Sequence, residues 1–212
     1  MKIDGAIFDF DGTLFDSMPI WKGIKFKFFD SIGLELSDEE KKTFEGISIP
    51  QALALAKERY GIAESDKELF ILFFGYMKKL YLEQAEPKND IIEFLEKLKA
   101  RGVKMGIATA TGEFALIAVL EKYGMRGYFS EIYSTHTVGA AKTEPKVYDV
   151  VLEKLGTPKE TTWVFEDALY AAKTVKANGY NLVGIFDESE PDTEDLKELS
   201  DIYINNYSEI DL

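Results

Sequence analysis

The chain alternates short apolar runs with longer amphipathic stretches, and this alternation restricts its fold more than any other feature. Apolar runs of strand length lie at 3–8, 103–108, 131–134, 162–165, 182–186 and 202–204. Helical spacing of apolar residues fills most of the gaps, at 90–98, 114–123, 145–155 and 168–177. Helices that connect successive strands return the chain to the same edge of a sheet, so the strands run parallel. We therefore predict an α/β protein with a doubly wound parallel sheet.

Residues 16–82 interrupt this alternation. Their apolar residues recur at helical spacing, as in Trp21, Ile24 and Phe28, and no convincing strand pattern occurs among them. We interpret these stripes as the buried faces of helices. The sequence thus predicts a main domain of residues 1–15 and 83–212, with a small all-helical domain, 16–82, inserted after the first strand and lying over the carboxyl edge of the sheet.

Composition excludes several kinds of chemistry. The 212 residues carry a formal net charge of −13, so long-range repulsion argues against nucleic acid and anionic membranes as partners. There is no cysteine, which rules out disulfides, thiolate nucleophiles and cysteine-ligated zinc. His136 is the only histidine, so a catalytic triad or metal site built on several histidines is excluded, and we expect His136 itself on a loop or the surface. Carboxylates, lysine, hydroxyls and backbone amides remain.

The apolar runs do not predict a membrane protein. No apolar run approaches the length of a membrane span, and the N-terminus enters a strand at once, without the pattern of a signal peptide. We expect a cytoplasmic monomer. The acidic residues of the tail, Asp187, Glu188, Glu190 and Asp192, match no metal-binding loop, and we expect them to be solvated.

A pair of aspartates directly follows the first predicted strand. Asp9 and Asp11 flank Phe10, and Gly12 and Thr13 come next. The run before them is apolar, as in a buried parallel strand, and open α/β sheets place their chemistry where such strands end. Two like charges this close repel unless a cation or a proton intervenes. The pattern therefore favours metal binding, acid/base catalysis or nucleophilic catalysis over a pair of simple turn residues.

Further polar groups follow other predicted strands or precede helices. Thr109 and the amide of Ala110 follow the second strand, where a helix start suits a phosphate oxygen. Lys142 lies in the sequence Lys-Thr-Glu-Pro that precedes a helix, and Glu166 and Asp167 follow the fourth strand. Each of these is weak alone, because threonines often cap helices and loop lysines are usually solvated. Their shared position at strand ends and helix starts makes the set informative.

With these motifs in this order, the chain resembles the haloacid dehalogenase-like superfamily, in particular its sugar phosphatase and β-phosphoglucomutase branch. The signature Asp-x-Asp-Gly-Thr is present as Asp9–Thr13, within the longer match FDFDGTLFDS at 8–17. The second motif corresponds to Thr109 and the acidic motif to Glu166 and Asp167. The Lys-Pro-x-Pro motif corresponds to 142–145, with threonine in place of its first proline. The resemblance spans nearly the whole chain and implies a Rossmann-like core with an inserted helical cap.

The resemblance also implies a catalytic scheme for the aspartates. Asp9 is the expected nucleophile that forms an aspartyl phosphate. Asp11 is the expected acid and base, protonating the leaving alcohol and then deprotonating the attacking water. Magnesium would be held by Asp9, the backbone carbonyl of Asp11 and Asp167, with Glu166 contributing directly or through water.

The remaining implied roles concern the substrate, a small phosphorylated metabolite. Thr109, the Ala110 amide and Lys142 would bind the phosphoryl oxygens. Substrate choice would fall to the cap, with Lys22, Lys25 and four further residues as candidates to face the site: Trp21, Gly46, Ile47 and Ser48. For Trp21, a place in the helical core is at least as plausible.

Within the family, the residues favour a phosphatase acting on a sugar phosphate. The family's dehalogenases and phosphonate hydrolases lack an acid at the position of Asp11. Its mutases carry an arginine where Ile49 stands and a histidine where Trp21 stands. A phosphomutase remains the alternative, and a catalytically silent module that binds phosphate or a partner is a third interpretation.

Overall fold

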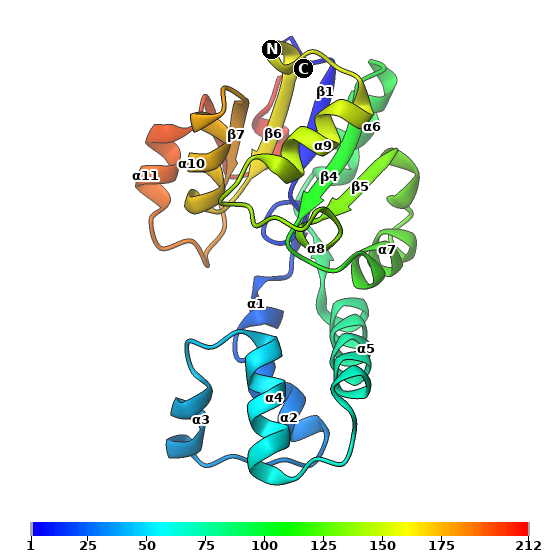
Figure 1. Cartoon of the computed structure of the whole chain (residues 1–212). Coiled ribbons are helices and arrows are strands. Elements are labelled where there is room, and N and C mark those ends of the chain that lie inside the picture. The colour runs from blue at the N-terminus through cyan, green and yellow to red at the C-terminus, as the bar shows by residue number, and fades with distance from the viewer. Residues whose placement is uncertain (1, 212) are drawn as a thin grey trace. The chain divides into compact units, whose positions relative to one another are not determined.

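The computed structural model describes residues 2–211 and contains a six-stranded sheet flanked by helices (Figure 1). Every neighbouring pair in this sheet is parallel. Its strands are β1 (Gly5–Phe8), β4 (Lys104–Thr109), β5 (Glu131–Ser134), β6 (Thr162–Glu166), β7 (Asn181–Ile185) and β8 (Ile202–Ile204). They lie in the order β5-β4-β1-β6-β7-β8. The predicted α/β, Rossmann-like, doubly wound fold is confirmed.

The order of the strands defines where a ligand would bind. If the six strands of this sheet are numbered from 1 to 6 in the order of the sequence, they lie side by side in the order 3-2-1-4-5-6. This arrangement is typical of dinucleotide-binding folds. The direction of winding reverses between β1 and β6, which pair along their whole shared length. In open α/β sheets, ligands bind outside the carboxyl ends of the strands at this reversal.

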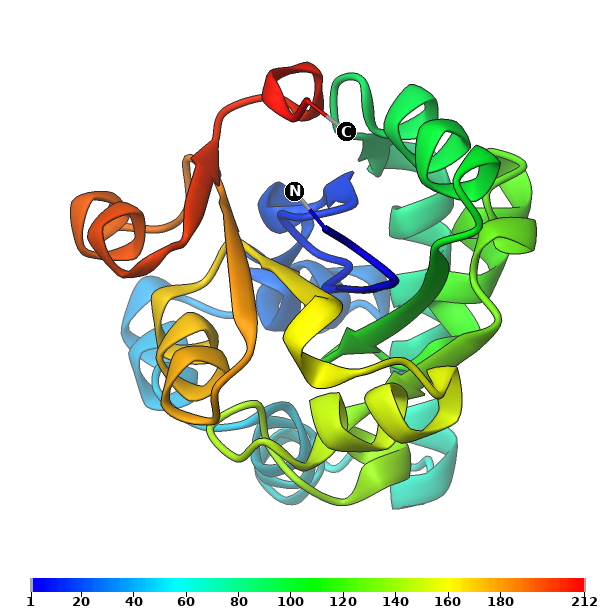
Figure 2. The same ribbon diagram turned by 90° about the horizontal axis from the view of Figure 1, so that it is seen from above.

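Helices cover both faces of the sheet. Figure 2 shows the sheet with α9 and α10 on one side and α6 on the other. The helices that accompany the sheet are α6 (Ile91–Ala100), α7 (Glu113–Lys122), α8 (Thr135–Val138), α9 (Lys146–Leu155), α10 (Leu169–Ala177) and α11 (Thr193–Leu199), with short 3₁₀ turns η1 (Arg126–Tyr128), η2 (Lys159–Thr161) and η3 (Tyr207–Glu209).

The alternation of side chains along β1 supplies a separate core to each face. Ile7 packs among aliphatic and small residues of α9 and α10, including Val151 and Ala172. Its neighbour Phe8 stacks on Phe165 with ring centroids 4.4 Å apart, on the face that α6 covers with Phe94. Because both faces are buried, β1 is apolar throughout, as parallel strands usually are.

Contacts divide the chain into two compact units, which we describe separately. The first unit comprises the residues up to Met18 and those from Ala85 onward, and the second unit is Pro19–Gln84. The sequence predicted an insertion of residues 16–82. The chain passes between them beside a short antiparallel pair, β2 (Phe15–Asp16) with β3 (Glu86–Pro87).

The second unit is helical. It contains α2 (Ile24–Ser31), α3 (Asp38–Phe44), α4 (Ile49–Tyr60) and α5 (Asp66–Gln84), and α1 (Met18–Trp21) leads into it. Phe28 contacts Phe73 edge-on with ring centroids 5.3 Å apart, and Phe29 contacts Phe44 at 5.2 Å. The apolar stripes seen in the sequence are therefore the core of this unit.

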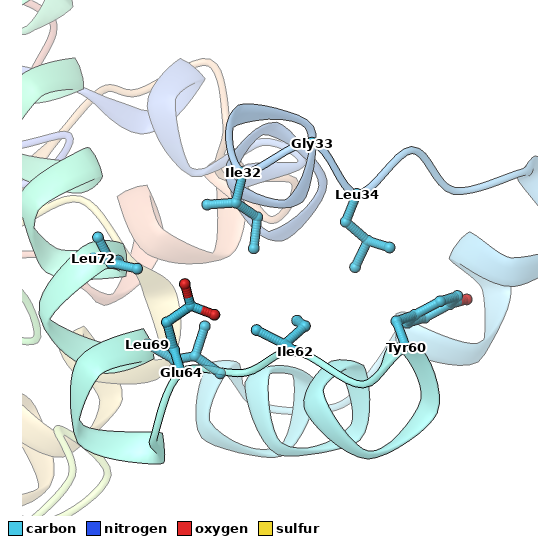
Figure 3. A pocket seen from close by; sticks show the side chains of 8 residues that line it. All are labelled: Ile32, Gly33, Leu34, Tyr60, Ile62, Glu64, Leu69 and Leu72. Atoms are coloured by element: carbon cyan, nitrogen blue, oxygen red, sulfur yellow. The ribbon is translucent and has the colours of Figure 1, made fainter.

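A cavity of about 270 Å³ lies within the second unit (Figure 3). Its lining is largely aliphatic and is formed by Ile32, Gly33, Leu34, Tyr60, Ile62, Glu64, Leu69 and Leu72. None of the residues in the sequence motifs lines it. Among the described residues, no helix has both the length and the apolar character needed to cross a membrane.

The prediction that the acidic tail is solvated was wrong in part. Asp187 is buried and pairs with Lys88 at 2.7 Å, and Glu190 accepts a hydrogen bond from the backbone amide of Leu169 at the start of α10.

Candidate active site

The aspartate motif forms a tight loop at the carboxyl end of β1. The backbone amide of Asp9 donates to the carbonyl of Phe165 at 2.9 Å, which ties the motif to β6. Gly12 has a φ of +77°, a conformation that favours glycine. A Cβ at Gly12 would also lie 2.1 Å from a carboxylate oxygen of Asp167. The glycine of the motif is thus required by the close approach of Asp167, which follows β6.

Asp9, Lys142 and Glu166 form a buried charged cluster. The Nζ of Lys142 lies 2.5 Å from Oδ1 of Asp9 and 2.5 Å from Oε1 of Glu166. All three side chains are at most 10% exposed. The predicted nucleophile, the predicted phosphate-binding lysine and one predicted metal ligand therefore meet, although they come from three separate segments.

Asp167 joins this cluster from the loop that follows β6. One of its carboxylate oxygens, Oδ1, accepts a hydrogen bond from the hydroxyl of Thr13 at 2.9 Å. The backbone carbonyl of Thr13 in turn accepts a bond from the buried hydroxyl of Tyr207 at 3.1 Å. Thr13, the last residue of the motif, thus holds Asp167 in place from the side of β1.

The cluster carries more negative charge than Lys142 neutralises. Burial, together with the charges of Glu166 and Asp11, raises the pKa of Asp9 to about 7, even though Lys142 acts in the opposite direction. Burial and the neighbouring Asp9 and Glu166 raise the pKa of Asp167 well above its usual range. Burial would lower the pKa of Lys142, but the same carboxylates outweigh it and raise that pKa instead.

This arrangement fits a divalent cation. Asp9, Glu166 and Asp167 each offer a carboxylate oxygen, and these oxygens lie within 4.8 Å of one another. Oε2 of Glu166 is buried and has no hydrogen-bond partner among the described residues. A buried carboxylate oxygen without a partner is costly unless a cation or water reaches it. Hard oxygen ligands of this kind suit Mg²⁺.

Asp11 is held apart from this cluster. Its Oδ1 accepts a hydrogen bond from the hydroxyl of Ser17 at 2.6 Å, and its Oδ2 accepts one from the hydroxyl of Thr111. The two aspartates of the motif therefore have different surroundings. Asp9 lies among charges, whereas hydroxyl donors orient the half-buried Asp11.

Thr109 and Ala110 lie at the end of β4. Thr109 is buried, and its hydroxyl oxygen accepts a hydrogen bond from the backbone amide of Thr111 at 3.0 Å. Ala110 is exposed. Parallel pairing of β4 with β1 brings this segment to the same edge of the sheet as Asp9.

The substrate candidates from the insertion belong to the second unit. Trp21 and Ile47 are half-buried there, and Gly46 is exposed with a φ of +73°. Ser48 forms a capping box with Gln51 at the start of α4. Lys25, which we also considered for the substrate, donates to the backbone carbonyls of Phe44 and Ile47 at 2.6 and 2.9 Å.

The sequence interpretation missed several side chains at the site. Tyr148 donates to Oε1 of Glu166 at 2.7 Å, but its helical spacing resembles that of a core residue. Ser17 lies within the quoted motif and Thr111 lies next to Ala110. Their hydroxyl groups so close to the motifs could have identified them as hydrogen-bond donors at the site. His136 is exposed on α8, as predicted, and it belongs to none of these contacts.

With this geometry in place, comparison with known proteins gives a consistent result. Residues 6–185 match the family model described as haloacid dehalogenase-like hydrolase. The chain belongs to this family. The structure of CbbY from Rhodobacter sphaeroides in complex with phosphate has the same fold, with a TM-score of 0.78, 19% identity and coverage of 98% of this chain and 96% of that one.

Two curated relatives of this family member are named as phosphatases. The phosphorylated carbohydrates phosphatase of Thermotoga maritima is 24% identical over 177 residues, which cover 84% of this chain and 82% of the relative. Hexitol phosphatase B of Escherichia coli is 27% identical over 179 residues, covering 83% and 80%. Family membership and these relatives together make this chain a phosphatase.

Proposed function

We propose that this phosphatase hydrolyses a small phosphomonoester, such as a sugar phosphate, in a Mg²⁺-dependent reaction that passes through a phosphorylated Asp9. The observation that carries the proposal is the buried cluster of Asp9, Lys142, Glu166 and Asp167 where the direction of winding reverses. A buried excess of carboxylates repels a phosphate ester unless a cation is present, so the composition of the site supports dependence on a metal.

The cation would be held by the carboxylates of Asp9 and Asp167, with Glu166 contributing directly or through water. The backbone carbonyl of Asp11 is a further candidate ligand, because the Asp11 carboxylate is engaged by Ser17 and Thr111. When bound, Mg²⁺ would supply positive charge that offsets the carboxylates and the phosphoryl oxygens.

Asp9 is the proposed nucleophile. One of its carboxylate oxygens forms a bond to phosphorus while the bond from phosphorus to the leaving alcohol oxygen breaks. Water then attacks the same phosphorus atom and releases inorganic phosphate, which regenerates the Asp9 carboxylate. The ammonium group of Lys142, which contacts Asp9 at 2.5 Å, is positioned to hold a phosphoryl oxygen, together with Thr109 and the amide of Ala110.

Asp11 is the proposed acid and base. It gives a proton to the departing alkoxide and then takes one from the attacking water, so no net proton is consumed on the enzyme. The hydroxyl groups of Ser17 and Thr111 fix its orientation. A sugar or other alcohol is a poor leaving group and needs this proton, which supports an ester of an alcohol as the substrate.

The helical unit is the proposed cap that selects the substrate, with Trp21, Gly46, Ile47 and Ser48 as candidate contacts. Relatives whose names specify phosphorylated carbohydrates and hexitol phosphates support a substrate of sugar size. The partner of this protein would then be a small metabolite.

The function is tested by measuring phosphate release from a panel of sugar phosphates, polyol phosphates and nucleoside monophosphates. We expect hydrolysis with Mg²⁺, loss of activity in excess EDTA and recovery when Mg²⁺ is restored. Full turnover in EDTA would contradict the mechanism. A hexose 1-phosphate with a bisphosphate primer serves as a separate arm, in which formation of the 6-phosphate would instead show a mutase.

A further inference from the structure

Glu166 is held asymmetrically at the end of β6. Its Oε1 accepts hydrogen bonds from both Lys142 at 2.5 Å and Tyr148 at 2.7 Å. Its Oε2 is buried and has no partner among the residues that the structure describes. The side chain is fully buried, so bulk water cannot satisfy that oxygen. One oxygen of the carboxylate is therefore anchored by two donors, while the other is left for something outside the chain.

Tyr148 reaches Glu166 from the helix that follows Lys142. It lies in the first turn of α9 and is fully buried. The Nζ of Lys142 lies 6.0 Å from the centre of the Tyr148 ring.

Lys142 alone does not account for the orientation of Glu166. Its ammonium group is shared with Asp9 and would also contact a phosphoryl oxygen in the proposed reaction. Tyr148, by contrast, has Glu166 as its hydroxyl partner and lies in a packed helix. It can therefore keep the carboxylate in place throughout the reaction.

We propose that Tyr148 is a positioning residue for the divalent cation, because its hydroxyl anchors Oε1 of Glu166 and thereby aims Oε2 at the carboxylate cluster. This inference rests on the proposed function, because it requires a cation bound by Asp9, Glu166 and Asp167. Groups that orient metal ligands in this way typically change metal affinity by about 10- to 100-fold when they are removed.

The chain offers a matched control in Tyr180. Tyr180 is also buried, at 2% exposure, and its ring centroid lies 6.2 Å from that of Tyr148. Its hydroxyl likewise donates to a carboxylate, Oδ1 of Asp149, at 2.5 Å. That carboxylate is not part of the cluster that would hold the cation. Tyr180→Phe therefore removes a hydrogen bond to a carboxylate, here a part-buried one, without altering Glu166.

The experiment measures Mg²⁺ affinity directly by isothermal titration calorimetry in the absence of substrate. We expect Tyr148→Phe to weaken binding by about tenfold or more, and Tyr180→Phe to remain within about twofold of the unmodified protein. Equal affinity of Tyr148→Phe and the unmodified protein would overturn the proposal, as would an equal loss in both variants. Absence of Mg²⁺ binding by the unmodified protein would instead overturn the proposed function itself.

A double-mutant cycle shows whether Tyr148 acts through Glu166. In a Glu166→Gln background, we expect the additional Tyr148→Phe substitution to change Mg²⁺ affinity by no more than about twofold, because the anchored carboxylate is gone. A further tenfold loss would mean that Tyr148 acts by another route and would overturn the proposal.

A measurement on the unmodified protein keeps the proposal testable if Tyr148→Phe does not fold. Tyrosine is labelled with ¹³C at the ring carbon that bears the hydroxyl. The NMR chemical shift of Tyr148 should then change during a Mg²⁺ titration, and the midpoint of this change should equal the midpoint measured by calorimetry. The signal of Tyr180 should not shift. A Tyr148 signal that is unaffected by saturating Mg²⁺ would contradict the inference.

Discussion

Polar side chains serve different purposes in the two units of this molecule. In the helical unit several of them form exposed local contacts three residues apart, as in the capping pairs Ser37–Glu40, Ser48–Gln51 and Ser65–Glu68. The longer contacts of Lys25 there are to backbone carbonyls. In the sheet unit, by contrast, Lys142 meets Glu166 across 24 residues and Thr13 meets Asp167 across 154, both buried.

The exposed local contacts stabilise helices, whereas the buried long-range contacts assemble the candidate active site. A helix cap contributes about 1 kcal/mol and needs only a short, exposed sequence pattern. Buried charges cost free energy on folding unless they are well paired, and well-packed apolar groups often replace them without loss of stability. In this buried cluster, Oε2 of Glu166 has no hydrogen-bond partner among residues 2–211, which is better explained by a bound ligand than by folding.

Substitution of the proposed nucleophile should have the largest effect. Asp9→Asn keeps the size of the side chain but removes the charged oxygen that attacks phosphorus, and we expect kcat to fall by about 10⁴-fold or more. Steady-state phosphate release measures this. Asp4→Asn is the matched control, because Asp4 is an exposed aspartate just before the opposite end of β1. Substantial activity in Asp9→Asn would mean that the buried cluster is not catalytic.

Asp11→Asn should have a smaller effect that depends on the leaving group. We expect kcat to fall by about 10²- to 10⁴-fold for a sugar phosphate, because its alkoxide needs a proton as it departs. The fall should be clearly smaller for p-nitrophenyl phosphate, whose leaving group needs no such proton. Equal losses for the two substrates would remove the acid role from Asp11.

The sequence anticipated the motif residues better than the residues that support them. The fold class and the family were predicted from strand–helix alternation and from the motif that begins at Asp9, because these depend on local patterns. The bounds of β5 and β8 matched the predicted runs. Tyr148 could not be recognised, because a tyrosine at helical spacing has the same pattern whether or not its hydroxyl contacts a carboxylate.

Long-range pairing explains the errors in the tail. Asp187 was expected to be solvated, but its partner Lys88 lies 99 residues away in the sequence. Helix α11 was missed because its residues are mostly charged, and it is anchored by the buried Leu196. The assignment of Ser48 to the substrate stays a prediction, since its capping role and a substrate contact give the same sequence pattern.

Asp187 offers a test of a buried ion pair whose effect is on stability. Burial alone would raise the pKa of Asp187, but hydrogen bonds from Lys88 and Ser189 and the charge of Lys88 outweigh burial and lower it. We expect Asp187→Asn to reduce the free energy of unfolding by about 1.5–3 kcal/mol near pH 7, as for hydrogen bonds to charged groups.

The sign of the pH dependence follows from the lowered pKa. The carboxylate stabilises the fold fully above the unfolded pKa of about 3.9, and its contribution is lost as the pH falls through the lower folded pKa. Urea unfolding should be measured for the unmodified protein and for Asp187→Asn. The difference between their free energies of unfolding should be constant from pH 5 to 8 and should shrink below about pH 4. A difference that persists unchanged in acid would exclude the ion pair as its cause.

The smallest effect is expected at Ser48 in the helical unit. Ser48→Ala should lower the free energy of unfolding by about 1 kcal/mol, and Ser48→Asp should restore it, because aspartate is an equally good helix cap. Thermal unfolding measures both. If Ser48 only caps α4, KM stays constant across the series. A large change in KM for Ser48→Asp despite restored stability would place Ser48 at the substrate and weaken the contrast between the units.

The phosphorylated intermediate on Asp9 is the most direct test of the account. Acid quenching during turnover with Mg²⁺, followed by borohydride reduction, converts an aspartyl phosphate to homoserine, and peptide mass spectrometry locates the converted residue. We predict conversion at Asp9 that requires both substrate and Mg²⁺ and is absent from Asp9→Asn. Conversion at another residue, or continued turnover with no conversion of Asp9 under conditions that trap the intermediate, would contradict the account.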